Sequence, residues 1–238
     1  MSSRATRRLR RLRPRTGPEW LTCSDPLLML EALRGRASER KLRLFAVGCC
    51  HRTLTGKTPA RSLLAVEVAE RFADGLAGRH ELLRARSLAF HAADQFSFRR
   101  SEELREKGEV WLPRNLSDEE VRLYFVAETA HPYTPFRIGL LRHRLRWDYQ
   151  LMRVAPAMLR DVVGNPFRSA TFDPCWRTPN VVVLARGMDD EGTFDRMPEL
   201  ADALEGAGCD DADTLGHCRG AGPHARGCWV IDALLGRS

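Results

Sequence analysis

Three cysteines and a histidine near the C-terminus are the residues whose types best suit chemistry. Cys209, Cys218, His224 and Cys228 follow one another with eight, five and three residues between them. Zinc prefers thiolate and imidazole ligands in a tetrahedral set of four, so a zinc site is one interpretation of these residue types. Pro223 and the glycines beside it would let the chain turn back on itself. No Cys-x2-Cys pair is present, which favours the other interpretation, in which these thiols are buried as small apolar groups.

A cysteine nucleophile activated by histidine is a second use of the same residues. His217 and Cys218 are neighbours, so on a helix their side chains point about 100° apart and cannot meet. His224 and Cys228 are four residues apart and would touch on a helix over 223–235. Because contact alone does not activate a thiol, no catalytic residue is predicted, and a non-enzymatic role is favoured.

Two short motifs elsewhere imitate functional sites without completing them. Gly56 and Lys57 resemble the end of a phosphate-binding loop, but that loop needs a glycine where this chain has His51. Glu128 and His131 have the Glu-x-x-His spacing of di-iron bundles, which require two such pairs. The chain contains one pair, so neither motif predicts a cofactor.

The formal net charge of +7 comes from the N-terminal tail. Residues 1–16 hold seven arginines and no acid, which leaves 31 basic and 31 acidic residues in the rest of the chain. Arginines could neutralise the phosphates of a nucleic acid, either in this tail or along one face of a helix expected over 136–154. The candidate contacts are Arg7, Arg8, Arg10, Arg11, Arg142, Arg146 and Arg153.

Helix signals recur along the whole chain and predict an all-α fold, an irregular bundle of about ten helices. Ser117 with Glu120 forms a capping box, and Pro26 follows a capping aspartate. Other helices are expected over 79–96 and 223–235. The run 181–184 could instead form a buried strand, but a single strand has nothing to pair with.

The same signals divide the chain into segments. Residues 1–17 are expected to form a disordered, arginine-rich tail. A helical region over 18–164 would then meet a second helical region over 165–238, packed on the first. The alternative is one domain over 18–238.

Several strings in the sequence are specific enough to compare with known families. They are Glu19-Trp20-Leu21-Thr22-Cys23-Ser24-Asp25-Pro26, Arg40-Lys41-Leu42-Arg43-Leu44-Phe45-Ala46, Arg160-Asp161-Val162-Val163-Gly164-Asn165-Pro166-Phe167-Arg168 and His217-Cys218-Arg219-Gly220. A further string runs from Gly222 to Asp232. Together these strings resemble an uncharacterised protein family expanded in planctomycete bacteria. The resemblance implies a bacterial, cytoplasmic setting and supplies no mechanism.

We expect a non-catalytic protein-interaction module in the cytoplasm, since no set of acid, base and nucleophile converges. Its partner would be another protein or a second copy of the chain, and no membrane is involved because no apolar stretch is long enough to span one. Two alternatives stay open: association with nucleic acid, and a zinc-binding or Cys/His enzyme centred on the C-terminal segment. No cofactor is expected unless that segment binds zinc.

Overall fold

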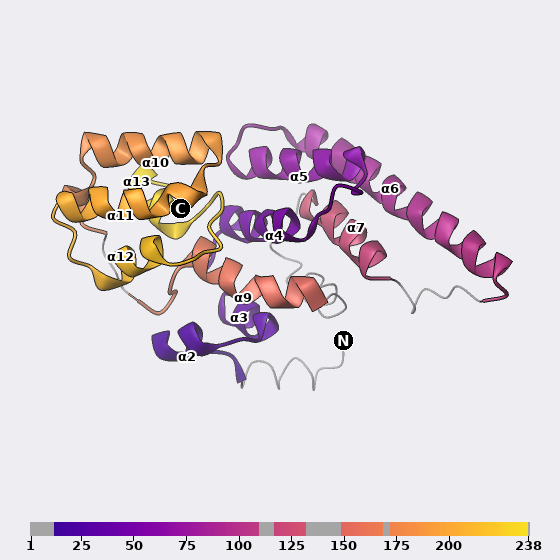
Figure 1. Cartoon of the computed structure of the whole chain (residues 1–238), viewed down its shortest axis with the longest axis horizontal. Helices are drawn as coiled ribbons and strands as arrows, with labels where there is room; N and C mark the ends of the chain where they lie inside the picture. Colours follow the sequence, from indigo (N-terminus) through magenta and orange to yellow (C-terminus); the bar gives the residue numbers. More distant parts are fainter. Residues whose placement is uncertain (1–11, 110–116, 132–148, 169–171, 238) are drawn as a thin grey trace. The chain divides into compact units, whose positions relative to one another are not determined.

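The computed structural model describes residues 12–109, 117–131, 149–168 and 172–237. Within these ranges the chain forms eleven α-helices and two short 3-10 helices with no strand, which confirms the all-α prediction (Figure 1). None of the described helices is long and apolar enough to cross a membrane. The expected tail lies outside the described residues as far as residue 11, whereas Thr16 already caps the first described helix by accepting from the Glu19 N–H.

The chain divides into two compact units. Unit 1 contains Met1–Lys41 and Ala155–Ser238, and unit 2 contains Leu42–Val154. The division therefore falls inside two helices, α4 (Glu39–Thr53) and α9 (Tyr149–Val163), and not at the boundary near residue 165 expected from the sequence.

In unit 2, α5 (Ala60–Ala73), α6 (Arg79–Glu106) and α7 (Asp118–Thr129) pack against one another (Figure 1). The capping box at Ser117 and Glu120 is confirmed, because each side chain bonds the other's backbone N–H. Helix α6 extends beyond the expected end near residue 96. No glycine or proline occurs between Arg79 and Glu106, so nothing in that stretch stops the helix.

Unit 1 carries the C-terminal segment and the helices around it. Its complete elements are α2 (Gly17–Thr22), α3 (Pro26–Ala32), η2 (Pro174–Trp176), α10 (Pro179–Glu191), η3 (Phe194–Arg196), α11 (Met197–Gly206), α12 (Ala212–Arg219) and α13 (Trp229–Leu235). The run 181–184 lies within α10, so the alternative of a strand was wrong. The last helix begins only at Trp229, because residues 221–228 form a loop that includes Pro223.

The core of this unit joins helices that are far apart in the sequence. Helix α10 packs on α11 and α13, and α11 packs on α12. Their buried side chains form one apolar cluster. With α11 and α13 fixed in this way, the ends of α12 and the loop 221–228 have a rigid support.

Candidate metal centre

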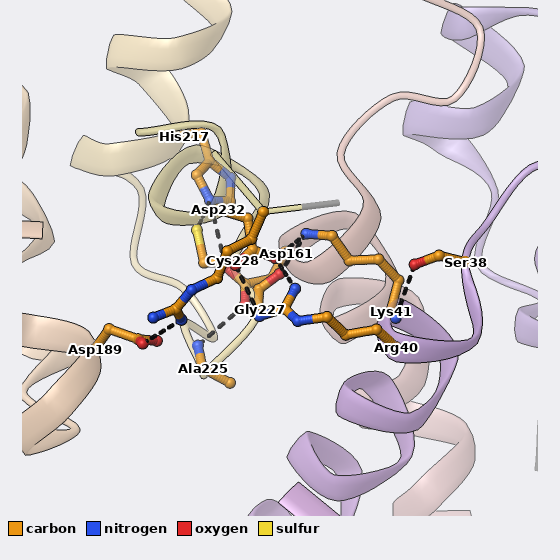
Figure 2. Close-up of polar contacts among 11 residues, drawn as sticks. Ser38, Arg40, Lys41, Asp161, Asp189, His217, Ala225, Gly227, Cys228 and Asp232 are labelled. Carbon is orange, nitrogen blue, oxygen red and sulfur yellow. Dashed lines mark hydrogen bonds and ion pairs between the residues drawn. The ribbon is translucent and has the colours of Figure 1, made fainter. Parts of the chain in front are cut away.

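Four side chains from separate parts of unit 1 converge on one point. Asp161 lies on α9, His217 on α12, His224 in the following loop and Cys228 immediately before α13. One oxygen, nitrogen or sulfur atom of each lies within 4.8 Å of every other. Figure 2 shows Asp161, His217 and Cys228 pointing toward one another. The four side chains are the candidate metal centre.

The donor atoms are close enough to share one ion. His224 Nδ1 lies 2.9 Å from Asp161 Oδ1, and His217 Nε2 lies 3.3 Å from the same oxygen. His217 Nε2 is also 3.2 Å from Cys228 Sγ. Both imidazole rings meet edge to face with centroids 4.9 Å apart. Zinc bonds of about 2.0–2.3 Å would fit between donors separated by such distances.

Local sequence brings His217 and the loop to this place. Asp211 caps α12 by accepting the Thr214 N–H at 3.2 Å, which fixes the start of the helix two turns before His217. The chain then reverses at Gly222, whose φ of +78° favours glycine. This reversal carries His224 and Ala225 back to α9.

Asp161 is the anionic anchor of the centre. Its side chain is only 2% exposed, and Oδ2 accepts the Ala225 N–H at 3.0 Å. Burial alone would raise the pKa of this carboxyl, but hydrogen bonds from His217 and His224 outweigh it and hold the pKa below the usual 3.8. Asp161 is therefore an ionised carboxylate with Oδ1 turned toward the other donors.

The contacts of His224 turn its Nδ1 toward Asp161. Nε2 lies 3.3 Å from the Gly220 carbonyl oxygen. Nδ1 faces an ionised carboxylate oxygen, which only accepts. Either a proton or a metal ion must therefore occupy Nδ1. A backbone carbonyl that holds the second ring nitrogen is the usual support of a metal-binding histidine.

The surroundings of Cys228 favour the thiol form and would stabilise the thiolate only with a cation beside it. Burial, followed by the negative charge of Asp161, raises the pKa of this fully buried thiol well above its usual 9.0. Hydrogen bonds from the backbone N–H groups of Ile231 and Val230 oppose the shift without reversing it. A divalent ion would add two positive charges beside the sulfur, and metal-bound cysteine is deprotonated.

The charges of the donor set match a divalent transition metal. Asp161 and a Cys228 thiolate contribute two negative charges, and two neutral imidazoles contribute none, so the loaded centre is electrically neutral. Neutrality matters because exposed fractions of the four side chains reach only 17%, at His217. Sulfur and imidazole donors favour zinc over magnesium or calcium, which take oxygen ligands.

A second ion-pair network anchors the loop next to Cys228. Lys41 Nζ donates to the Gly227 carbonyl at 2.8 Å and lies 2.5 Å from a carboxylate oxygen of Asp232, which Arg40 also contacts at 2.6 Å (Figure 2). Asp232 is 1% exposed, and the two cations compensate the burial of its negative charge. Burial lowers the pKa of Lys41, although Asp232 acts to raise it.

The predicted ligands separate into two groups. His224 and Cys228 belong to the centre, whereas Cys209 and Cys218 lie in the apolar core of unit 1. Burial raises the pKa of the Cys218 thiol to about 12, as is usual for a structural cysteine. The side chains of the neighbours His217 and Cys218 point in different directions, as expected, since His217 reaches Asp161 and Cys218 enters the apolar core.

Asp161 and His217 were not foreseen as ligands. Asp161 is distant in sequence from the other donors, and no spacing rule connects a residue of α9 to the C-terminal loop. His224 and Cys228 do come together, but in a loop ahead of α13 and not on one helix. A signal for His217 existed, because two histidines and two cysteines occur within 217–228.

The predicted nucleic-acid contacts fall largely outside the described residues. Arg7, Arg8, Arg10, Arg11, Arg142 and Arg146 all do so. Arg153 is exposed on α9. The loop at Gly56 and Lys57 connects α4 to α5, so the strand that precedes a phosphate-binding loop is replaced by a helix.

Comparisons with protein-family models, with curated proteins and with solved structures each find no match. Function is therefore inferred from the chemistry of Asp161, His217, His224 and Cys228.

Proposed function

We propose that this protein binds one zinc ion through Asp161, His217, His224 and Cys228. The observation that carries the proposal is the convergence of one carboxylate oxygen, two imidazole nitrogens and one thiol sulfur within 4.8 Å of one another. The 2.9 Å between His224 Nδ1 and Asp161 Oδ1 adds support, because a metal ion would replace the proton that lies between these two atoms.

The proposed role of the ion is to fix the C-terminal segment. Four protein ligands fill a tetrahedral coordination sphere, which is the arrangement of structural zinc. The ligands come from α9, α12 and the loop before α13, so one ion would connect three parts of unit 1. A structural ion agrees with the non-catalytic role expected from the sequence. The protein-interaction and nucleic-acid hypotheses themselves stay predictions.

Elemental analysis of the full chain, purified without chelator, tests the proposal. We expect about one zinc per chain. Cys228→Ser and His224→Gln should each lower the zinc content to a small fraction of the wild-type value, because each removes a donor. Cys209→Ser and Cys218→Ser are matched controls that alter buried thiols outside the centre and should retain zinc.

Two outcomes would contradict the proposal. One is a wild-type chain that contains no zinc and takes up none when dialysed against it. The other is zinc that survives in Cys228→Ser and His224→Gln but is lost in Cys209→Ser and Cys218→Ser, which would move the site to the core cysteines. Circular dichroism on every variant shows whether a lost ion reflects a lost ligand or a lost fold.

A further inference from the structure

A cleft in unit 1 opens beside the metal centre. It has a volume of about 920 Å3 and is bounded by the C-terminal end of α9, η2, the start of α12 and α13. His217 lines the cleft and also belongs to the metal centre. Volumes of roughly 300–1,000 Å3 are typical of sites for small molecules.

One part of the lining is aromatic and rigid. Phe172 and Trp176 meet edge to face with ring centroids 5.2 Å apart. Trp229 packs so closely on Gly164 that a Cβ at position 164 would lie 3.0 Å from the indole ring. The centroid of the Trp229 ring lies 5.4 Å from that of the His217 ring. These rings offer an apolar surface whose orientation is already fixed.

A cation lines the cleft without a carboxylate to balance it. Arg160 donates to the backbone carbonyls of Cys23 and Trp20, the latter at 3.4 Å, and these hold its guanidinium in place. Its buried Nε has no hydrogen-bond partner, and no ion pair joins Arg160 to an acid within the described ranges. A guanidinium of this kind is suited to an incoming carboxylate.

The segment before α12 contributes the opposite charge. Asp210, Asp211 and Asp213 line the cleft, and Arg168 pairs with Asp211 and, at 2.7 Å, with Asp213. One arginine against three aspartates leaves a net charge of −2 on this part of the lining. Asp210 is exposed and forms no ion pair among the described residues, so its carboxylate is available to a cation.

We infer that the cleft binds a small zwitterion of the α-amino-acid type. The ligand's carboxylate would meet Arg160, its ammonium group would meet Asp210 and the neighbouring acids, and an apolar side chain would lie on Trp176 and Trp229. Neither a plain anion nor a plain cation would use both charged parts of the lining. This inference goes beyond the proposed zinc site and stands on the cleft residues, so the two can fail separately.

Titration of the full chain with three related probes tests the inference. L-Phenylalanine carries both charges, 3-phenylpropanoate lacks the ammonium group, and phenethylamine lacks the carboxylate. Tryptophan fluorescence, excited where phenylalanine does not absorb, reports occupancy, and calorimetry gives stoichiometry. Zinc content is measured on the same samples, so loss of the ion is not mistaken for loss of the ligand.

We expect one L-phenylalanine per chain, with each truncated probe binding at least tenfold more weakly. Asp210→Asn should weaken L-phenylalanine by about threefold, in the range for an exposed ion pair. Asp190→Asn, a matched change on α10 outside the cleft, should bind as wild type. The inference is overturned if L-phenylalanine does not bind, if either truncated probe binds as well, or if both variants bind alike. A chain that contains zinc but binds no L-phenylalanine overturns only the inference about the cleft. A chain that binds L-phenylalanine but contains no zinc overturns only the proposed metal centre.

Discussion

Zinc binding should release about one proton per ion at pH 8, and the proton should come from Cys228. The thiol is fully buried and its pKa lies well above 9.0, so it is protonated in the metal-free protein at this pH. Asp161 has a lowered pKa and is already ionised, so it releases none. Since a bound thiolate must first lose its proton, the apparent affinity should rise about tenfold per pH unit while the free thiol stays protonated.

Calorimetry in buffers of different ionisation enthalpy measures this release. The slope of the observed enthalpy against the buffer's ionisation enthalpy equals the number of protons transferred. We expect a slope near one for the wild type. For the weaker zinc binding that remains in Cys228→Ser, titrated at higher concentration, we expect a slope near zero because the serine hydroxyl does not ionise in this range. Cys218→Ser is the control, and its slope should match the wild type. A slope near zero in the wild type, or an unchanged slope in Cys228→Ser, would refute the assignment of Cys228 as a ligand.

Three further predictions concern the metal-free protein, measured by urea unfolding. Asp161→Asn should lower the free energy of unfolding by about 2–4 kcal/mol at pH 7, because it leaves hydrogen-bond donors without their buried carboxylate. Since the pKa of Asp161 in the folded protein lies below 3.8, the contribution of this carboxylate to the free energy of unfolding is complete above pH 3.8 and is lost as the pH falls through the folded pKa. The difference in unfolding free energy between wild type and Asp161→Asn should therefore close in acid. A difference that stays constant with pH would argue against the lowered pKa. Gly164→Ala should lower the free energy of unfolding by about 2–4 kcal/mol, because φ is +69° there and the new Cβ would meet the Trp229 ring. Gly192→Ala has the same φ but open space around the Cβ, so it should lower the free energy of unfolding by about 1–2 kcal/mol. Equal losses in the two variants would show that Trp229 does not crowd position 164.

Much of the fold could be predicted because its signals are local. The capping box at Ser117 and the cap at Asp25 act within one helical turn, and both are present in the structure. Errors arose where local signals were weak or misleading. Helix α6 lacks a stop before Glu106, and the apolar spacing after Pro223 suggested helix in a segment where the backbone forms a loop.

The centre could be only half predicted, for a physical reason. Residue types suitable for zinc can be read directly from a sequence, and in this way His224 and Cys228 were identified. Which donors meet depends on packing between α9 and the C-terminal loop, and that packing is set by long-range contacts such as Ala225 N–H to Asp161. Cys209 and Cys218 have the right chemistry, but the apolar core of unit 1 encloses them.

X-ray absorption at the zinc edge tests the central claim most directly, because it counts the ligand atoms around the ion. A site made by Asp161, His217, His224 and Cys228 predicts one sulfur at about 2.3 Å and three nitrogen or oxygen atoms at about 2.0–2.2 Å. Cys228→Ser, measured with zinc supplied in excess of the chain, should lack the sulfur shell. A wild-type spectrum with two or more sulfurs, or with none, would contradict this assignment of the ligands.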